Sequence, residues 1–137
     1  MKRLIAAAGA AILALGGCSK AVEAPTDPGA CFLMSPQKDG STKFNKIADG
    51  IKDIEHCALQ IELVRRNFRR LGSMQEEYIG GFQGSFVFVE RQGISTSTKL
   101  DGIRYPMLVR FQNELVAPGA IVEGKAPPGT VELPPSK

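Results

Sequence analysis

The spacing of the hydrophobic residues changes once along this chain, and that change constrains the fold most. Between Phe44 and Leu71, apolar or small residues recur at steps of three or four, which puts them on one face of an α-helix. From Phe82 to Phe111 they recur at every second position, as in strands with one buried face. The sequence therefore predicts a helix followed by strands. The helical stripe consists of Phe44, Ile47, Ile51, Ile54, Ala58, Ile61, Val64, Phe68 and Leu71.

The residues that flank this stripe set the expected helix boundaries. Asp39 or Ser41 is suited to cap the start of a long helix over about residues 42–71. Gly72 is suited to end it, since glycine is favoured just past a helix C-terminus. Gly50 lies inside this range, where a glycine costs about 1 kcal/mol. A bend or a break at Gly50 is therefore compatible with the pattern.

The rest of the pattern predicts a short helix and three strands. Ser73 and Glu76 have the spacing of a capping box, which favours a short helix to about residue 79. The alternation over about 82–111 then predicts a three-stranded antiparallel meander, and Asp101-Gly102 is a hairpin turn signal within it. Pro106 has no N–H to donate, so the third strand is expected at an edge or with a bulge.

Together these elements predict an α+β fold. A small sheet with one apolar face and a lone amphipathic helix are each unstable alone. The long helix and the short helix are therefore expected to pack on the meander, in a single domain over residues 31–117. Residues 18–30 hold few large apolar groups and are expected to be a flexible tether. Residues 118–137 are rich in Pro and Gly and are expected to be a disordered tail.

The start of the chain has the layout of an export signal. Lys2 and Arg3 precede an apolar run from Leu4 to Gly17 that is shorter than the roughly 20 residues of a membrane-spanning helix. The sequence Leu15-Gly16-Gly17-Cys18 resembles the lipobox of bacterial lipoproteins. The resemblance implies that residues 1–17 are a signal peptide and that Cys18 carries a lipid. With Ser19 after the cysteine, it also implies the periplasmic face of the outer membrane.

Two further cysteines remain once Cys18 is assigned to lipid. Cys31 and Cys57 would lie in a compartment that permits disulfides. A bridge between them would stabilise the fold by roughly 3 kcal/mol in the chain-entropy model. We expect this bridge; the alternative is two reduced cysteines that act as small buried apolar groups.

Charge excludes one class of partner and singles out one cluster. Without residues 1–17 the chain keeps 15 of its 17 basic residues against 14 acidic ones, so its net charge does not favour nucleic acid. The one concentrated feature is a helical strip that is a candidate anion-binding site for lipid headgroups, lipopolysaccharide phosphates, acidic glycans or acidic protein surfaces. The alternative is a solvated face whose cations suit the C-terminal end of the helix dipole. The strip comprises Arg65, Arg66, Arg69 and Arg70.

The sequence offers no set of residues for catalysis or metal binding. His56 is the only histidine, and Asp53 and Gln60 beside it make a poor ligand set. The glycines at 80–84 match no phosphate-binding motif, and no nucleophile elbow is present. We therefore expect no enzyme activity, no cofactor and no metal.

These observations predict a non-enzymatic envelope lipoprotein. Its lipid would hold it to the membrane, and it would bind or scaffold another envelope component, an envelope protein in particular. Self-association through the long helix is a further possibility, because the stripe approximates a heptad pattern in places. The alternative function is a small module that binds a lipid or glycan on an aromatic sheet face. That face would comprise Phe82, Phe86, Phe88, Tyr105 and Phe111.

Overall fold

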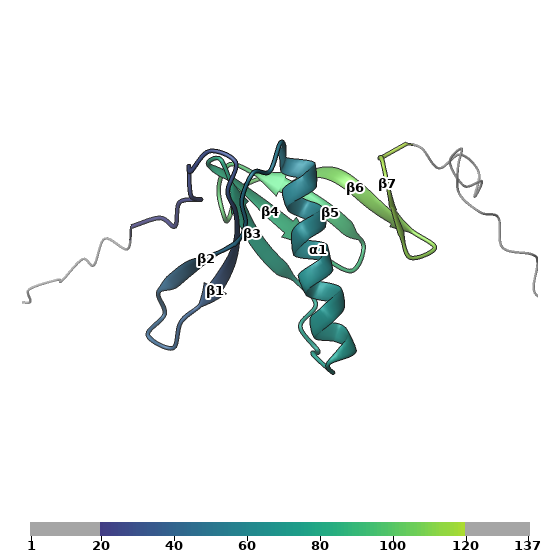
Figure 1. Ribbon diagram of the computed structural model, residues 1–137, viewed down its shortest axis with the longest axis horizontal. Helices are drawn as coiled ribbons and strands as arrows, with labels where there is room; N and C mark the ends of the chain where they lie inside the picture. The colour runs from purple at the N-terminus through teal and green to yellow at the C-terminus, as the bar shows by residue number, and fades with distance from the viewer. Residues whose placement is uncertain (1–19, 120–137) are drawn as a thin grey trace, which may run out of the picture.

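The computed structural model describes residues 20–119, which form one seven-stranded antiparallel sheet and one helix, α1 (Ile54–Arg70) (Figure 1). Cys18, the leader and residues 120–137 lie outside this range. The strand order in the sheet is β2-β1-β3-β4-β5-β6-β7. The strands are β1 (Cys31–Pro36), β2 (Thr42–Ala48), β3 (Tyr78–Phe82), β4 (Ser85–Val89), β5 (Gly93–Ser97), β6 (Tyr105–Phe111) and β7 (Glu114–Val116).

The expected long helix over 42–71 is wrong, because its first part is strand β2. Phe44 and Ile47 are three residues apart, which on a helix would place them on one face. On a strand the same step places them on opposite faces. Phe44 packs with the cluster around Phe86, whereas Ile47 packs with the cluster around Ile61. The three-residue spacing that we interpreted as helical therefore comes from a strand that has apolar residues on both faces.

Helix α1 begins only after a break in the chain. Gly50 has a φ of 69°, in the left-handed region that ends regular structure. Asp53 then caps the helix, because its Oδ1 accepts a hydrogen bond from His56 N at 2.9 Å. The helix is 17 residues long and connects β2 to β3, two parallel strands with β1 between them. The break at Gly50 that the pattern allowed is therefore present.

The short helix expected after Ser73 is also wrong. Ser73 Oγ accepts from Gln75 N at 3.3 Å in an extended segment, and the chain enters β3 at Tyr78. Gly80 is part of this strand, not the end of a helix. A Cβ on Gly80 would overlap the side chain of Ile61 and the carbonyl oxygen of Phe32. The absence of a side chain at Gly80 therefore lets α1 pack closely on the sheet, and this packing explains why a glycine stands at this position.

The three strands expected over 82–111 are antiparallel neighbours, but they are only part of a larger sheet. The expected fold, a long and a short helix on a three-stranded meander, is therefore wrong. β7 pairs only with Val109, Arg110 and Phe111 of β6, so Pro106 has a strand partner on one side alone, Ser95 in β5. The register between β5 and β6 also shifts at Ile94/Ser95, so the expected irregularity lies next to Pro106.

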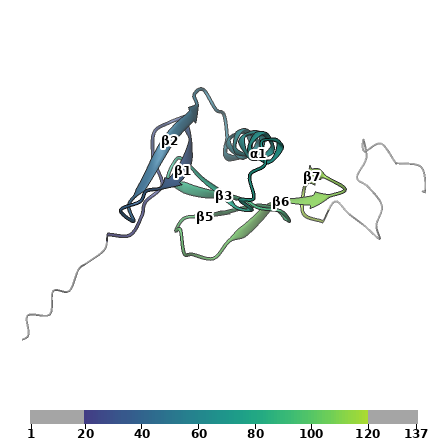
Figure 2. The ribbon, with the colours of Figure 1, turned by 90° about the horizontal axis from the view of Figure 1, so that it is seen from below.

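The sheet has an apolar core on each face. Figure 2 shows α1 almost end-on, above β3, β5 and β6, with β1 and β2 rising beside it. The core under α1 includes Ile61, Val87 and Val89, which are all 0% exposed. On the other face Phe86 and Phe88, also 0% exposed, pack under Ala24 and its neighbours.

Residues 20–30, which we expected to be part of a flexible tether, thus contribute to this second core. Ala24 is 7% exposed, and Pro25 O accepts a hydrogen bond from Gly84 N at 2.8 Å. Gly29 O accepts another from Ile51 N at 2.9 Å. Both views place this segment at the β2 side of the molecule, away from β6 and β7 (Figures 1 and 2).

The predicted disulfide is confirmed. Cys31 in β1 and Cys57 in α1 are bonded, with their Cα atoms 5.3 Å apart, and both are 0% exposed. The bond joins the first turn of α1 to the sheet. It fixes one end of the helix over the core.

Candidate functional site

A buried carboxylate lies on the sheet-facing side of α1. Glu62 is 2% exposed, although it does not belong to the apolar stripe that predicted the buried face of the helix. The helix buries Cys57, Ala58, Ile61, Glu62 and Arg65. The buried stripe is therefore rotated from the one that the sequence predicted, and Phe68 and Leu71 at its expected end are 48% and 83% exposed.

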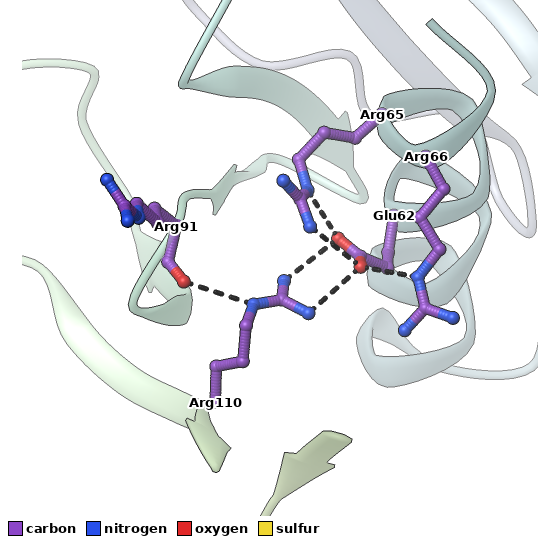
Figure 3. Close-up of polar contacts among 5 residues, drawn as sticks. All are labelled: Glu62, Arg65, Arg66, Arg91 and Arg110. Carbon is purple, nitrogen blue, oxygen red and sulfur yellow. Dashed lines mark hydrogen bonds and ion pairs between the residues drawn. The ribbon is translucent and has the colours of Figure 1, made fainter. Parts of the chain in front are cut away.

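Three arginines surround the Glu62 carboxylate (Figure 3). Arg65 donates from Nε to Oε2 at 2.7 Å and from Nη2 to Oε1 at 3.1 Å. Arg66 donates from Nε to Oε1 at 2.8 Å. Arg110, from β6, donates from Nη1 to Oε1 and from Nη2 to Oε2, both at 3.1 Å. The carboxylate therefore binds two arginines of its own helix and one of the sheet.

These contacts decide the charge of Glu62. Burial alone would raise its pKa, but hydrogen bonds from Arg65, Arg66 and Arg110 outweigh burial and lower the pKa to about 2. In turn, the hydrogen bond to Glu62 raises the pKa of Arg65 above its ordinary value. All four groups are therefore charged at neutral pH.

The sheet holds Arg110 in place from the other side. Arg110 Nε donates to Arg91 O at 3.0 Å, and Arg110 N donates to Gln92 O at 2.8 Å. Gln112 and Asn113 follow with φ values of 47° and 69°, in the tight turn between β6 and β7. The turn after β4 and the turn after β6 thus meet beside the C-terminal half of α1.

The resulting surface pocket has a volume of about 450 Å³. We call it the arginine pocket, and it is lined by Arg65, Arg66, Arg69, Arg91, Arg110 and Asn113. Five arginines thus line the pocket, and three of them, Arg65, Arg66 and Arg110, bind the Glu62 carboxylate. Among residues 20–119, the side chains of Arg69 and Arg91 make no hydrogen bond or ion pair. The pocket is therefore strongly cationic.

The structure brings together part of the predicted arginine strip. Arg65, Arg66 and Arg69 line the pocket, whereas Arg70 Nη2 donates to Asn67 Oδ1 at 2.6 Å outside it. Arg91, Arg110 and Asn113 also line the pocket, and Glu62 binds three arginines beside it, but the sequence pattern singled out none of these four residues. The spacing of Glu62 to Arg65 and Arg66, three and four positions, was a signal for local ion pairs. No local signal pointed to Arg91 or Arg110, which arrive through the sheet.

A second polar cluster lies where β3 and β4 meet the start of β6. Arg104 Nη1 donates to Glu77 Oε1 at 2.6 Å and to Glu90 Oε1 at 2.7 Å. Its guanidinium lies 3.8 Å from the centre of the Phe88 ring. Burial and the neighbouring Glu77 raise the pKa of Glu90, and Arg104 opposes this rise. Arg104 therefore holds two close carboxylates together over the second core.

The aromatic residues that we grouped on one sheet face are divided between both faces. Phe82 packs under α1, whereas Phe86 and Phe88 lie on the other face, because the turn at Gln83-Gly84 changes the alternation. Phe86 and Phe88 are fully buried, and Tyr105 is 64% exposed. The side chains of Phe82, Phe86 and Phe88 therefore serve as packing.

Neither a metal-binding cluster nor a membrane-spanning helix is present among residues 20–119. Among residues 20–119, no three His, Cys, Asp or Glu side chains gather as a metal site would require. His56 pairs with Asp53 at the exposed start of α1, with Nδ1 2.7 Å from Oδ1. The part of the chain that the structure describes contains no helix both long and apolar enough to span a bilayer.

Comparison with protein-family models, with curated proteins and with solved structures finds no match to this chain.

Proposed function

We propose that this protein is a lipid-anchored, non-enzymatic module of the bacterial envelope that binds an anionic envelope component through the arginine pocket. The observation that carries the proposal is the surplus of positive charge, because five arginines line the pocket and Glu62 is the one carboxylate that pairs with any of them among residues 20–119. A cationic, water-filled recess attracts anions, and arginine forks match carboxylate and phosphate oxygens.

The residues of the pocket favour binding over catalysis. Arginine stays protonated at physiological pH, and an asparagine amide has no proton to exchange in that range. Glu62, with a pKa of about 2, is a poor base because it is held by three guanidinium groups. The described lining thus lacks a nucleophile or a general base, so it suits recognition of a charged group.

The proposed location rests on the sequence and on the disulfide. The lipobox-like segment at Leu15-Gly16-Gly17-Cys18 supports acylation of Cys18, and Ser19 supports the periplasmic face of the outer membrane. The buried bond between Cys31 and Cys57 is typical of proteins that fold outside the reducing cytosol. An envelope address also supplies abundant anionic partners.

The anchor is tested by Cys18→Ala, with Ser19→Ala as the matched control. We expect Cys18→Ala to abolish labelling by a radioactive or clickable fatty acid and to release the protein from membranes. The Ser19→Ala chain should stay labelled. Labelling of Cys18→Ala that equals the wild type would refute the anchor.

The pocket is tested by crosslinked capture from intact envelopes. The double variant Arg66→Gln/Arg69→Gln removes two pocket cations, whereas Arg70→Gln removes one cation from the same helix turn outside the pocket. We expect the double variant to lose the captured component and Arg70→Gln to retain it. Identical capture by all three proteins would contradict the pocket as the binding site.

A further inference from the structure

We infer that the arginine pocket recognises a phosphate monoester carried on a polar, sugar-like group. This inference rests on the proposed function and specifies its ligand. Three properties of the pocket lead to it: its uncompensated charge, its unused N–H donors and the polarity of its lining.

The charge of the pocket matches a dianion better than a single carboxylate. Glu62 already neutralises one of the five arginines, so four positive charges remain around about 450 Å³. A phosphate monoester brings about −1.5 to −2 charges at neutral pH and three acceptor oxygens on one centre. A carboxylate brings one charge and two oxygens. The phosphate therefore compensates more of the charge from one position.

The donors that Glu62 leaves free are held in fixed positions. Arg65 uses Nε and Nη2 for Glu62 and makes no protein hydrogen bond from Nη1 among the residues that the structure describes. Its side chain is 7% exposed, so the packing around it limits its movement. Arg66 uses Nε for Glu62, which leaves both of its terminal nitrogens. Glu62 thus acts as a positioning residue that orients guanidinium groups before a ligand arrives.

The lining of the pocket selects the group that carries the phosphate. All of its described lining side chains are arginine or asparagine. No aromatic ring lines the pocket for a nucleobase to stack on, and no aliphatic side chain lines it for an acyl chain. Its volume is within the range of about 300–1,000 Å³ of small-molecule sites. A hydroxylated carrier such as a sugar suits this surface.

The pH dependence of binding separates phosphate from carboxylate. The second pKa of a phosphate monoester is about 6, so its dianion is lost between pH 7.5 and pH 5. A sugar carboxylate keeps its charge over this range. The charged groups of the pocket are the arginines of α1, Arg91 and Arg110, with the Glu62 carboxylate beside them, and arginine side chains as a class stay protonated in proteins. Glu62, with a pKa of about 2, stays ionised over this range. A change in affinity over this range therefore reports the ligand.

The experiment uses the lipidated full chain in phosphatidylcholine vesicles, titrated calorimetrically with two matched sugars. Glucose 6-phosphate carries a phosphate at the position where glucuronic acid carries a carboxylate. We expect glucose 6-phosphate to bind at least about tenfold more tightly at pH 7.5 and to lose about tenfold between pH 7.5 and pH 5. The glucuronic acid affinity should not change with pH.

Variants tie this binding to the pocket. We expect Arg69→Gln and Arg91→Gln each to weaken glucose 6-phosphate binding by about tenfold, the value of one charge-assisted hydrogen bond. Arg70→Gln should leave it unchanged. Addition of phosphatidic acid to the vesicles tests the source of the phosphate. If phosphatidic acid competes with glucose 6-phosphate, the natural ligand is assigned to a membrane headgroup. If it does not compete, the ligand is assigned to a soluble or glycan-borne phosphate.

Three results would overturn the inference. Equal affinity for both sugars, without a change with pH, would refute phosphate recognition and leave the proposed anion-binding pocket intact. Binding that Arg69→Gln and Arg91→Gln do not weaken would refute the site itself. Loss of the envelope capture by Arg66→Gln/Arg69→Gln, together with no binding of either sugar, would refute this ligand class but not the proposed function.

Discussion

Glu62 and Arg110 are 48 residues apart in the sequence, yet Arg110 donates from Nη1 to Oε1 of Glu62 and from Nη2 to Oε2, each at 3.1 Å. This pair joins α1 to β6, while the bond between Cys31 and Cys57 joins the first turn of α1 to β1. The helix is therefore linked to the sheet at two places, one covalent and one ionic. Removal of either link should be measurable.

Glu62→Gln should destabilise the fold by about 3 kcal/mol at pH 7. The substitution leaves three arginines beside a neutral amide, and the removal of one partner of a buried ion pair costs about 3–5 kcal/mol. Access of water to Arg66 keeps the value near the lower end. Urea unfolding monitored by circular dichroism gives this number. Glu55→Gln, at an exposed position in the first turn of α1, should cost less than about 1 kcal/mol.

The contribution of Glu62 should disappear in acid. Its folded pKa of about 2 lies below the ordinary value of 4.5, so the folded state binds this proton less tightly than the unfolded state. The stabilisation is therefore complete above about pH 5 and is lost as the pH falls towards 2. Across that range the wild type should lose roughly 3 kcal/mol of its advantage over Glu62→Gln. Glu90 titrates in both proteins, so the difference between their unfolding curves isolates Glu62. A difference that stays constant from pH 6 to pH 2 would contradict this assignment.

Loss of the disulfide should cost about 3–4 kcal/mol. The bond closes a loop with a sequence separation of 26, and the chain-entropy model gives this magnitude for such a loop. The measurement compares unfolding of the wild type with that of Cys31→Ala/Cys57→Ala. Both positions are fully buried, so the small cavities that the two alanines leave add to this cost. An unchanged unfolding midpoint would show that the link does not stabilise the native state.

Gly80→Ala should destabilise the contact between α1 and β3 by about 1–3 kcal/mol, the usual cost of overpacking. The added methyl group would overlap Ile61 and the Phe32 carbonyl oxygen, and the strand backbone there cannot yield easily. Gly40→Ala is the comparison, because nothing lies within 4 Å of a Cβ there and only its φ of 82° opposes the change. Chemical denaturation of both variants should show the larger loss for Gly80→Ala. The double variant Gly80→Ala/Ile61→Val should recover part of it.

The fold was predictable where local pattern and final structure agree. The alternation from Ser85 to Phe111 predicted strands, and Asp53 to Arg70 keep a true helical period. The prediction failed where one spacing of apolar residues is compatible with two kinds of secondary structure. The step from Phe44 to Ile47 fits one helix face or two strand faces, and only the presence of cores on both sides of the sheet decides between them.

The site was predictable only in part, for a different reason. Arg65, Arg66 and Arg69 form a visible cluster in the sequence, and they do line the pocket. Glu62 looked like a solvent-facing residue, because an isolated carboxylate is rarely buried. Its burial depends on Arg110, which the sheet brings from a distant segment. A partner that is 48 residues away leaves no periodic signal in the sequence.

The docking of Ala24 on the sheet has a consequence for how the protein would stand at the membrane. With Cys18 acylated, as we propose, only the four residue steps to Val22 separate the lipid from the packed domain, a reach of at most about 14 Å. The domain would then be held close to the bilayer. Figure 1 draws the turn between β6 and β7, which supplies Asn113 to the arginine pocket, at the far end of the ribbon from the segment that begins at residue 20. The lipid would thus be attached at one end of the molecule, and the arginine pocket at the other end would face the periplasmic space.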